Sequence, residues 1–266
     1  MGAFPMHTGA ARLNSGMNPG MDPGAGQEQA DAPIMRSVGD TCLVVDFGQG
    51  VDLELNRRVV AFAQRVRDAA LPGVDDIVPS FTTVGLHYRP EAVRTRPGLT
   101  PLAAVEAAAR ELLQAARDAP ARSPRVVEIP VCYGGEWGPD LDELAARAGI
   151  APAELVRRHG HGLRSVFMVG FAPGHPYLGL WDEAFDLPRR ATPRPRVPAG
   201  TVGVANRQCV IYPFELPSGW NLIGRTPLAL FDPRARVPCL LAPGDHVRFI
   251  PVDREAFERL RERADA

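Results

Sequence analysis

Short apolar runs begin at Ile34, and their spacing predicts a series of small elements. The segment IMRSVGDTCLVVDFG contains two strand-like runs on either side of Gly39, as in a β-hairpin. Apolar residues then recur at helical spacing over residues 55–70, and the pattern stops at Pro72. This part of the chain is therefore predicted to form a hairpin followed by a helix.

A second copy of the same pattern follows. The runs DDIVPS and TTVGLHYRP indicate two more strands. Thr100 can cap the next helix, with Pro101 at its first position and an apolar stripe at helical spacing after it. The order ββαββα predicts one four-stranded sheet with two helices on one face. We assign this small α/β domain to residues 34–119.

The second half of the chain reads as a series of strands, after the Pro-punctuated linker RDAPARSPR. Seven runs are predicted as strands: Val126–Val131, Arg164–Val169, Thr201–Ala205, Gln208–Tyr212, Trp220–Ile223, Pro227–Phe231 and Asp245–Ile250. Short strands divided by Gly and Pro predict a β-barrel or a sandwich, which we assign to residues 124–252. The fold class is therefore α+β, with a C-terminal helix or tail at residues 253–266.

A helical insert, Asp140–Gly160, interrupts these strands, with Gly149 between two short helices and Pro152 at the start of the second. It superficially resembles a DNA-binding helix-turn-helix. The near-neutral charge and the strands on both sides favour an excursion that covers one mouth of the barrel. His159 and His161 could offer two nitrogens to a metal, but no third ligand lies at a suitable spacing. We expect exposed loop histidines and no metal site.

Composition and charge narrow the class of protein. Residues 1–33 hold six Gly and four Pro without apolar periodicity, so we expect a disordered leader there. The net charge of -1 gives no electrostatic reason for nucleic acid or an anionic membrane as a partner. No apolar stretch approaches the ~20 residues of a spanning helix, and no secretory leader is recognisable. We predict a soluble, cytoplasmic protein.

All 30 basic residues are arginine, because the chain contains no lysine. It therefore offers no Walker A lysine, no lysine that could form a Schiff base with PLP, and no lysine that could carry biotin. The four cysteines are far apart and form no CxxC pair, which indicates neither a structural zinc cluster nor a disulfide framework.

Several long motifs resemble the family of the 5-oxoprolinase B subunit, which is also described as allophanate hydrolase subunit 1 or the Kip inhibitor family. They are GFAPGHPYLGL at Gly170–Leu180, the run Pro188–Trp220, and LIGRTPLALFDP at Leu222–Pro233. The resemblance extends from about Ile34 to Val252. It implies a small N-terminal α/β domain followed by a cyclophilin-like β-barrel, which agrees with the patterns above and does not imply prolyl isomerase activity.

The resemblance implies three possible roles. The first is the B subunit of a prokaryotic ATP-dependent 5-oxoprolinase, which opens the lactam of 5-oxoproline to L-glutamate with the A and C subunits. The second is a carboxyltransferase or allophanate hydrolase component of a urea carboxylase-type system, and the third is an inhibitor of a sensor histidine kinase. We expect the first role, with ATP bound by the complex, no biotin or PLP on this chain, and no activity without the partner subunits.

Candidate substrate-binding residues lie in the loops and strand ends of the region that carries the resemblance, where binding groups sit on a rigid scaffold. A small carboxylate with a lactam needs a planar cation, amide-type donors and acceptors, and an aromatic wall. The candidates for these needs are, in order, Arg194, Arg196 and Arg225; Gln208 and Thr226; and Tyr212 and Trp220. Each arginine has a surface or loop-bracing role as its alternative, and both aromatic residues have core packing.

His175 is the candidate for catalysis, because a histidine in that loop could titrate near neutrality and shuttle a proton. The family that the chain resembles commonly has Phe at this place, so the motif itself carries no acid/base role. A packing residue substituted by histidine is the alternative. We expect the active site to form where the barrel mouth meets the C subunit.

Overall fold

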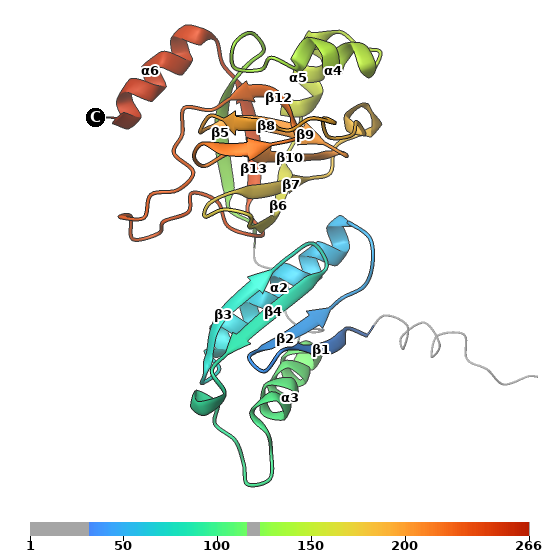
Figure 1. Ribbon diagram of the computed structural model, residues 1–266, viewed down its shortest axis with the longest axis vertical. Coiled ribbons are helices and arrows are strands. Elements are labelled where there is room, and N and C mark those ends of the chain that lie inside the picture. Colours follow the sequence, from blue (N-terminus) through green and yellow to red (C-terminus); the bar gives the residue numbers. More distant parts are fainter. Residues whose placement is uncertain (1–31, 116–122, 266) are drawn as a thin grey trace, which may run out of the picture. The chain divides into compact units, whose positions relative to one another are not determined.

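The computed structural model describes residues 32–115 and 123–265 of the chain, and Figure 1 shows its elements. The predicted leader lies outside these residues except for its last two positions. The first elements are β1 (Ile34–Val38), β2 (Cys42–Asp46), α2 (Leu53–Ala69), β3 (Val74–Pro79), β4 (Thr83–Tyr88), the 3-10 turn η1 (Pro90–Ala92) and α3 (Pro101–Gln114). The strands form one antiparallel sheet in the order β1-β2-β4-β3, which confirms the ββαββα prediction.

Side-chain caps fix where both helices of this domain begin. The Asp52 carboxylate accepts the backbone N–H of Leu55 at 2.9 Å, and the Thr100 hydroxyl accepts that of Ala103 at 3.2 Å. Each cap satisfies one of the N–H groups that a first helical turn leaves without a partner. The cap at Thr100 confirms the prediction from the sequence.

The two helices pack on the same face of the sheet. Fully buried residues of α2, among them Val59 and Phe62, join one apolar cluster with Val105 of α3 and with Leu43 and Leu86 of the sheet. Alternate strand residues point into this cluster because successive side chains of a strand face opposite sides. One face of the sheet therefore supplies the core of the domain.

Seven strands close the barrel, in the order β10-β7-β6-β13-β5-β12-β9. They are β5 (Val126–Tyr133), β6 (Arg164–Val169), β7 (Pro176–Gly179), β9 (Thr201–Ala205), β10 (Gln208–Ile211), β12 (Asn221–Arg225) and β13 (His246–Pro251). The β13–β5 pair is parallel, and the other neighbours that pair in this barrel are antiparallel. Two further strands, β8 (Arg194–Val197) and β11 (Leu216–Ser218), form a small sheet of their own.

Six of the seven strand predictions in this domain are confirmed, and one is wrong. The run Pro227–Phe231 forms only an isolated bridge between Phe231 and Cys239. Proline has no N–H to donate to a ladder, and the N–H of Leu228 is taken locally by the Thr226 hydroxyl at 3.3 Å. The barrel strand that was not predicted is β7. The Gly and Pro residues of its motif interrupt the apolar pattern by which a strand is recognised.

Two short helices, α4 (Leu141–Arg147) and α5 (Pro152–Gly160), form the predicted insert and lie at one end of the barrel in Figure 1. Their buried residues Leu144 and Leu155 belong to the apolar cluster inside the barrel. The last helix is α6 (Arg254–Asp265). Within the described residues, none of the helices has the length and apolar character that crossing a membrane requires.

Candidate functional site

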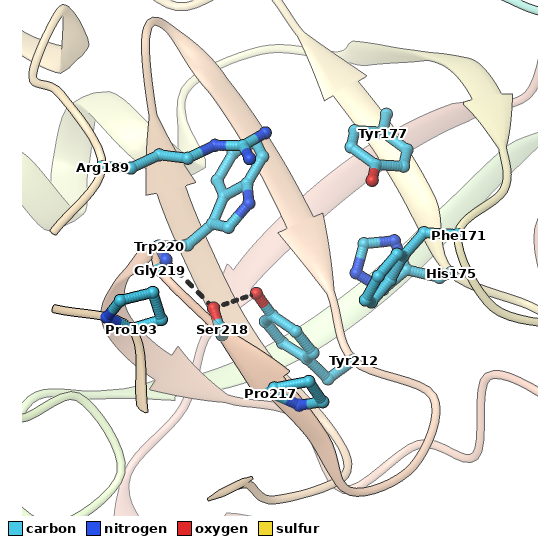
Figure 2. A pocket seen from close by; sticks show the side chains of 10 residues that line it. All are labelled: Phe171, His175, Tyr177, Arg189, Pro193, Tyr212, Pro217, Ser218, Gly219 and Trp220. Carbon is cyan, nitrogen blue, oxygen red and sulfur yellow. Dashed lines mark hydrogen bonds between the residues drawn. The ribbon is translucent and has the colours of Figure 1, made fainter. Parts of the chain in front are cut away.

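An aromatic pocket of about 270 Å³ opens in the barrel domain (Figure 2). Three segments of the chain supply its walls: the motif that leads into β7, the loop before β8, and the connection from β10 through β11 to β12. The lining residues are Phe171, His175, Tyr177, Arg189, Pro193, Tyr212, Pro217, Ser218, Gly219 and Trp220. Tyr177 lies in β7, and Tyr212 and Trp220 directly adjoin β10 and β12, so three aromatic residues of the pocket are anchored on the closed barrel.

The Tyr212 wall of the pocket is held by a small hydrogen-bond network. The Tyr212 and Ser218 hydroxyls are hydrogen-bonded, and the Ser218 oxygen also accepts the backbone N–H of Trp220 at 3.0 Å (Figure 2). Burial raises the pKa of Tyr212 to about 12, so its phenol stays protonated at neutral pH. Trp220 and Tyr212 are both nearly fully buried and give the pocket an aromatic wall of fixed shape.

His175 lies in the pocket wall next to Tyr212, inside a tight turn (Figure 2). Its backbone N–H donates to the Ala172 carbonyl at 3.0 Å, and its own carbonyl accepts the N–H of Gly170 at 3.0 Å. The imidazole is 1% exposed and lies 5.0 Å from the Tyr177 ring and 5.1 Å from the Tyr212 ring. Burial lowers the pKa of His175 to about 4, so the ring is neutral at pH 7, with one donor and one acceptor nitrogen.

Arg189 supplies the positive charge of the pocket. Its guanidinium lies over the Trp220 indole, 4.9 Å from the ring centre, in a cation–π arrangement (Figure 2). Among the described residues no carboxylate forms an ion pair with it. The pocket therefore combines an unpaired cation, aromatic walls and a neutral hydrogen-bonding ring.

Of the residues predicted from the sequence, His175, Tyr212 and Trp220 line this pocket. The structure places Gln208 and Thr226 elsewhere. Gln208 begins β10, where it is opposite Gly179 and Ala205, and Thr226 is 2% exposed. The structure does not bring these two residues to the pocket that the three others share.

The three predicted arginines each have a different partner. The Arg194 guanidinium donates to both Asp140 oxygens, at 2.9 and 2.6 Å. Arg196 is 81% exposed, with 3.7 Å between its Nε and a Glu215 oxygen. Arg225 donates from Nε to the Ala199 carbonyl at 2.7 Å. The loop-bracing alternative therefore describes Arg194 and Arg225, and a substrate contact stays a prediction for all three.

Asp140 is the centre of this bracing. The carboxylate is 4% exposed, and besides Arg194 it accepts a hydrogen bond from Arg190 at 3.0 Å and from the backbone N–H of Leu222 at 2.7 Å. These bonds connect the start of α4 and the strand β12 to the loop that carries Arg189. The position of the pocket's cation thus depends on a buried carboxylate outside the pocket.

Comparison with known proteins matches this chain along most of its length. The family described as carboxyltransferase domain, subdomain C and D, matches residues 33–241. The 5-oxoprolinase B subunit of Bacillus subtilis is 37% identical over 234 residues, which is 87% of this chain and 98% of the relative. The chain belongs to the 5-oxoprolinase B-subunit family.

Two further comparisons add to these similarities. The 5-oxoprolinase B subunit of Escherichia coli is 39% identical over 214 residues, or 80% of this chain and 94% of the relative. The crystal structure of TTHA0988 is 39% identical with a TM-score of 0.66, over 80% of this chain and 40% of that one. This 5-oxoprolinase B-subunit family member therefore spans less than half the length of that solved relative.

Seven pocket residues of this B-subunit family member were not predicted from the sequence: Phe171, Tyr177, Arg189, Pro193, Pro217, Ser218 and Gly219. The first two flank His175 in the motif GFAPGHPYLGL, so the spacing to a candidate residue could have identified them. Arg189 gave no such signal, since every basic residue of the chain is arginine.

His159 corrects the expectation of exposed loop histidines. It is 1% exposed at the end of α5, where its Nδ1 and the Tyr133 hydroxyl are hydrogen-bonded at 2.7 Å. Its ring stacks on Trp181 with 4.9 Å between centroids and 8° between planes. The residue lies on the inward face of the helix, whereas His161, just beyond the helix, is exposed as expected.

We expect the stability of the protein to fall as the pH drops below the ordinary histidine value of 6.5, partly because of His159. Burial lowers the pKa of its folded state to about 3, so between these values the unfolded chain binds a proton that the folded chain does not. The free energy of unfolding then decreases by about 1.4 kcal/mol per pH unit for this group. Urea unfolding between about pH 7 and pH 5 measures the slope.

The His159→Gln variant is expected to show a smaller slope than the wild type, because it lacks the titrating ring. His161→Gln is the matched control, because it makes the same substitution at an exposed position two residues away. Buried His175 adds a similar contribution in all three proteins. Equal slopes for wild type and His159→Gln would contradict the prediction.

Proposed function

We propose that this chain is the B subunit of an ATP-dependent 5-oxoprolinase, which cleaves the lactam of 5-oxoproline to L-glutamate together with the A and C subunits. The observation that carries the proposal is the 37% identity that extends over 98% of the Bacillus subtilis 5-oxoprolinase B subunit. The pocket supports it, since an unpaired cation and aromatic walls suit a small ring with a carboxylate.

ATP is assigned to the partner subunits in this proposal. The chain has no lysine, and no glycine-rich GxGxxG loop leads from a strand into a helix. Its residues therefore do not fit a phosphate-binding loop of the usual kinds. The role of this chain is to hold and orient the small carboxylate, and the requirement for ATP favours a cytoplasmic location of the complex.

Reconstitution tests the proposal directly. We expect ATP-dependent glutamate release from 5-oxoproline when this chain is combined with the A and C subunits, and none from this chain alone. The measurement is glutamate formed over time, with each component omitted in turn. Release that is unaffected by omission of this chain would refute its role in the enzyme.

A second candidate function follows from the family description, which names a carboxyltransferase domain. In that case the chain would serve a urea carboxylase-type system, and biotin would be carried by a partner because this chain has no lysine. Replacing 5-oxoproline by urea and bicarbonate in the same assay, with a biotin carboxylase partner, distinguishes the two. Urea-dependent ATP hydrolysis without glutamate release would favour the second candidate.

A further inference from the structure

His175 is a buried polar side chain whose two ring nitrogens make no hydrogen bond with any other residue in the described part of the chain. Figure 2 shows the ring in the wall of the pocket, beside Tyr177 and Tyr212. Buried polar groups in folded proteins are almost always paired, either within the protein or with a bound molecule. Both nitrogens are covered in this structure, and the 67%-exposed Phe171 ring lies 5.4 Å from the imidazole. An unpaired imidazole at a pocket wall therefore indicates a ligand that supplies the missing partner once the Phe171 ring moves aside.

Arg189 lies on another side of the same pocket, and its guanidinium has no ion-pair partner among the described residues. Its guanidinium carbon lies 4.9 Å from the centre of the Trp220 ring, and a contact with the face of a ring uses none of its N–H groups as in-plane donors. Such a guanidinium binds carboxylates through two parallel hydrogen bonds. The two sides of the pocket thus favour different ligand groups: Arg189 favours an anion, and His175 favours a neutral polar group.

The space between them suits one small molecule. The volume of about 270 Å³ lies just below the roughly 300 to 1,000 Å³ of pockets that hold drug-sized ligands. Aromatic side chains form half of the remaining lining, and among them Trp220 and Tyr212 offer ring surface to the apolar body of such a ligand. Tyr177 adds a hydroxyl that points into the pocket above the His175 ring in Figure 2.

We propose that this pocket binds a small molecule with a carboxylate at one end and an amide or lactam at the other, the carboxylate on Arg189 and the amide on His175 and Tyr177. A neutral imidazole donates one hydrogen bond and accepts another, which matches the C=O and N–H of a lactam. The inference rests on the proposed function, because 5-oxoproline carries both groups on one ring. It moves the substrate site from the three predicted arginines to Arg189.

Ligands that lack one group test the two contacts separately. The complex of this chain with the A and C subunits, without ATP, is titrated with 5-oxo-L-proline, with 2-pyrrolidinone, which has no carboxylate, and with L-proline, which has no lactam carbonyl. Ligand-observed NMR registers weak binding of all three. The variants are Arg189→Gln and His175→Phe, and Arg234→Gln, at an exposed arginine outside the pocket, is the matched control.

We expect Arg189→Gln to weaken 5-oxo-L-proline binding by about tenfold or more and to leave 2-pyrrolidinone binding unchanged. His175→Phe keeps an aromatic ring in the wall, and it should weaken 5-oxo-L-proline but not L-proline. Arg234→Gln should bind all three as the wild type does. Wild-type affinity in both pocket variants, an equal loss in the control, or no binding of any probe to the wild type would overturn the proposal.

Glutamate release separates this inference from the proposed function. If the complex releases glutamate but Arg189→Gln keeps the wild-type KM for 5-oxoproline, the pocket assignment fails and the function stands. If 5-oxo-L-proline binds through Arg189 and His175 but no glutamate forms, the function fails and the pocket assignment stands. Because Arg189 is exposed, its variant is expected to fold and the test does not depend on His175→Phe.

Discussion

Replacement of Asp140 by alanine is expected to lower the free energy of unfolding by about 3 to 5 kcal/mol. The 4%-exposed carboxylate holds two guanidinium groups, and its removal leaves the partly buried charge of Arg194 without its partner and that of Arg190 with only Glu143, 3.9 Å away. The backbone N–H of Leu222 loses its acceptor as well. Urea unfolding of the wild type and Asp140→Ala measures the difference.

Asp142→Ala is the matched control, because this carboxylate is exposed on the same helix, α4. We expect it to change the free energy of unfolding by less than about 0.5 kcal/mol. Since Asp140 also braces the loop of Arg189, its variant should raise the KM of the reconstituted enzyme for 5-oxoproline. An Asp140→Ala protein as stable as the control would show that the arginines find other partners at no cost.

Substitution of Gly138 by alanine is expected to destabilise the protein by about 3 kcal/mol or more. A Cβ at this position would lie 2.1 Å from the Ile223 carbonyl oxygen and 2.6 Å from the Gly134 nitrogen. Both are backbone atoms, one of them in β12, so no side-chain rotation relieves the overlap. Where the backbone angles suit alanine and there is room for a Cβ, the same substitution stabilises a protein by about 0.4 to 1 kcal/mol. A loss of stability at Gly138 would therefore indicate the backbone overlap.

Gly219→Ala provides the comparison for Gly138→Ala. A Cβ there would meet its nearest neighbour, the Arg190 carbonyl oxygen, at 3.7 Å, which is ordinary van der Waals contact. Thermal and urea unfolding of both variants should separate them clearly, with Gly219→Ala close to the wild type. Similar stability of the two variants would mean that the backbone of β12 shifts at Ile223 with little cost in free energy, which would contradict the prediction.

Local signals were enough to predict most of the fold. The Thr100 cap, the stop near Pro72 and the strand runs all depend on residues close in sequence, and the structure has the elements there. The run Pro227–Phe231 was predicted as a strand and is not one, and β7 was missed. At both places Gly and Pro interrupt the alternation of apolar residues. The closing order of the barrel depends on pairings between distant strands, and no local pattern contains it.

The site was predicted less well because its residues acquire their surroundings from far along the chain. Arg194 was predicted to bind the carboxylate of a ligand, but it binds the buried carboxylate of Asp140, which lies 54 residues earlier in the chain. Tyr212 and Trp220 were recognised by residue type, and Arg189 was not, since nothing in the sequence distinguishes it from other arginines. The burial of His159 likewise follows from which face of α5 meets the barrel.

The position of β13 has a consequence for how the protein is made. This strand is the last of the barrel in sequence, yet it lies between β6 and β5. On the ribosome, the facing edges of β5 and β6 stay unpaired until residues 246–251 emerge, while the sheet within residues 34–88 already has all its strands. Open strand edges can pair with other nascent chains, so the interval before β13 appears is when this chain most needs a chaperone.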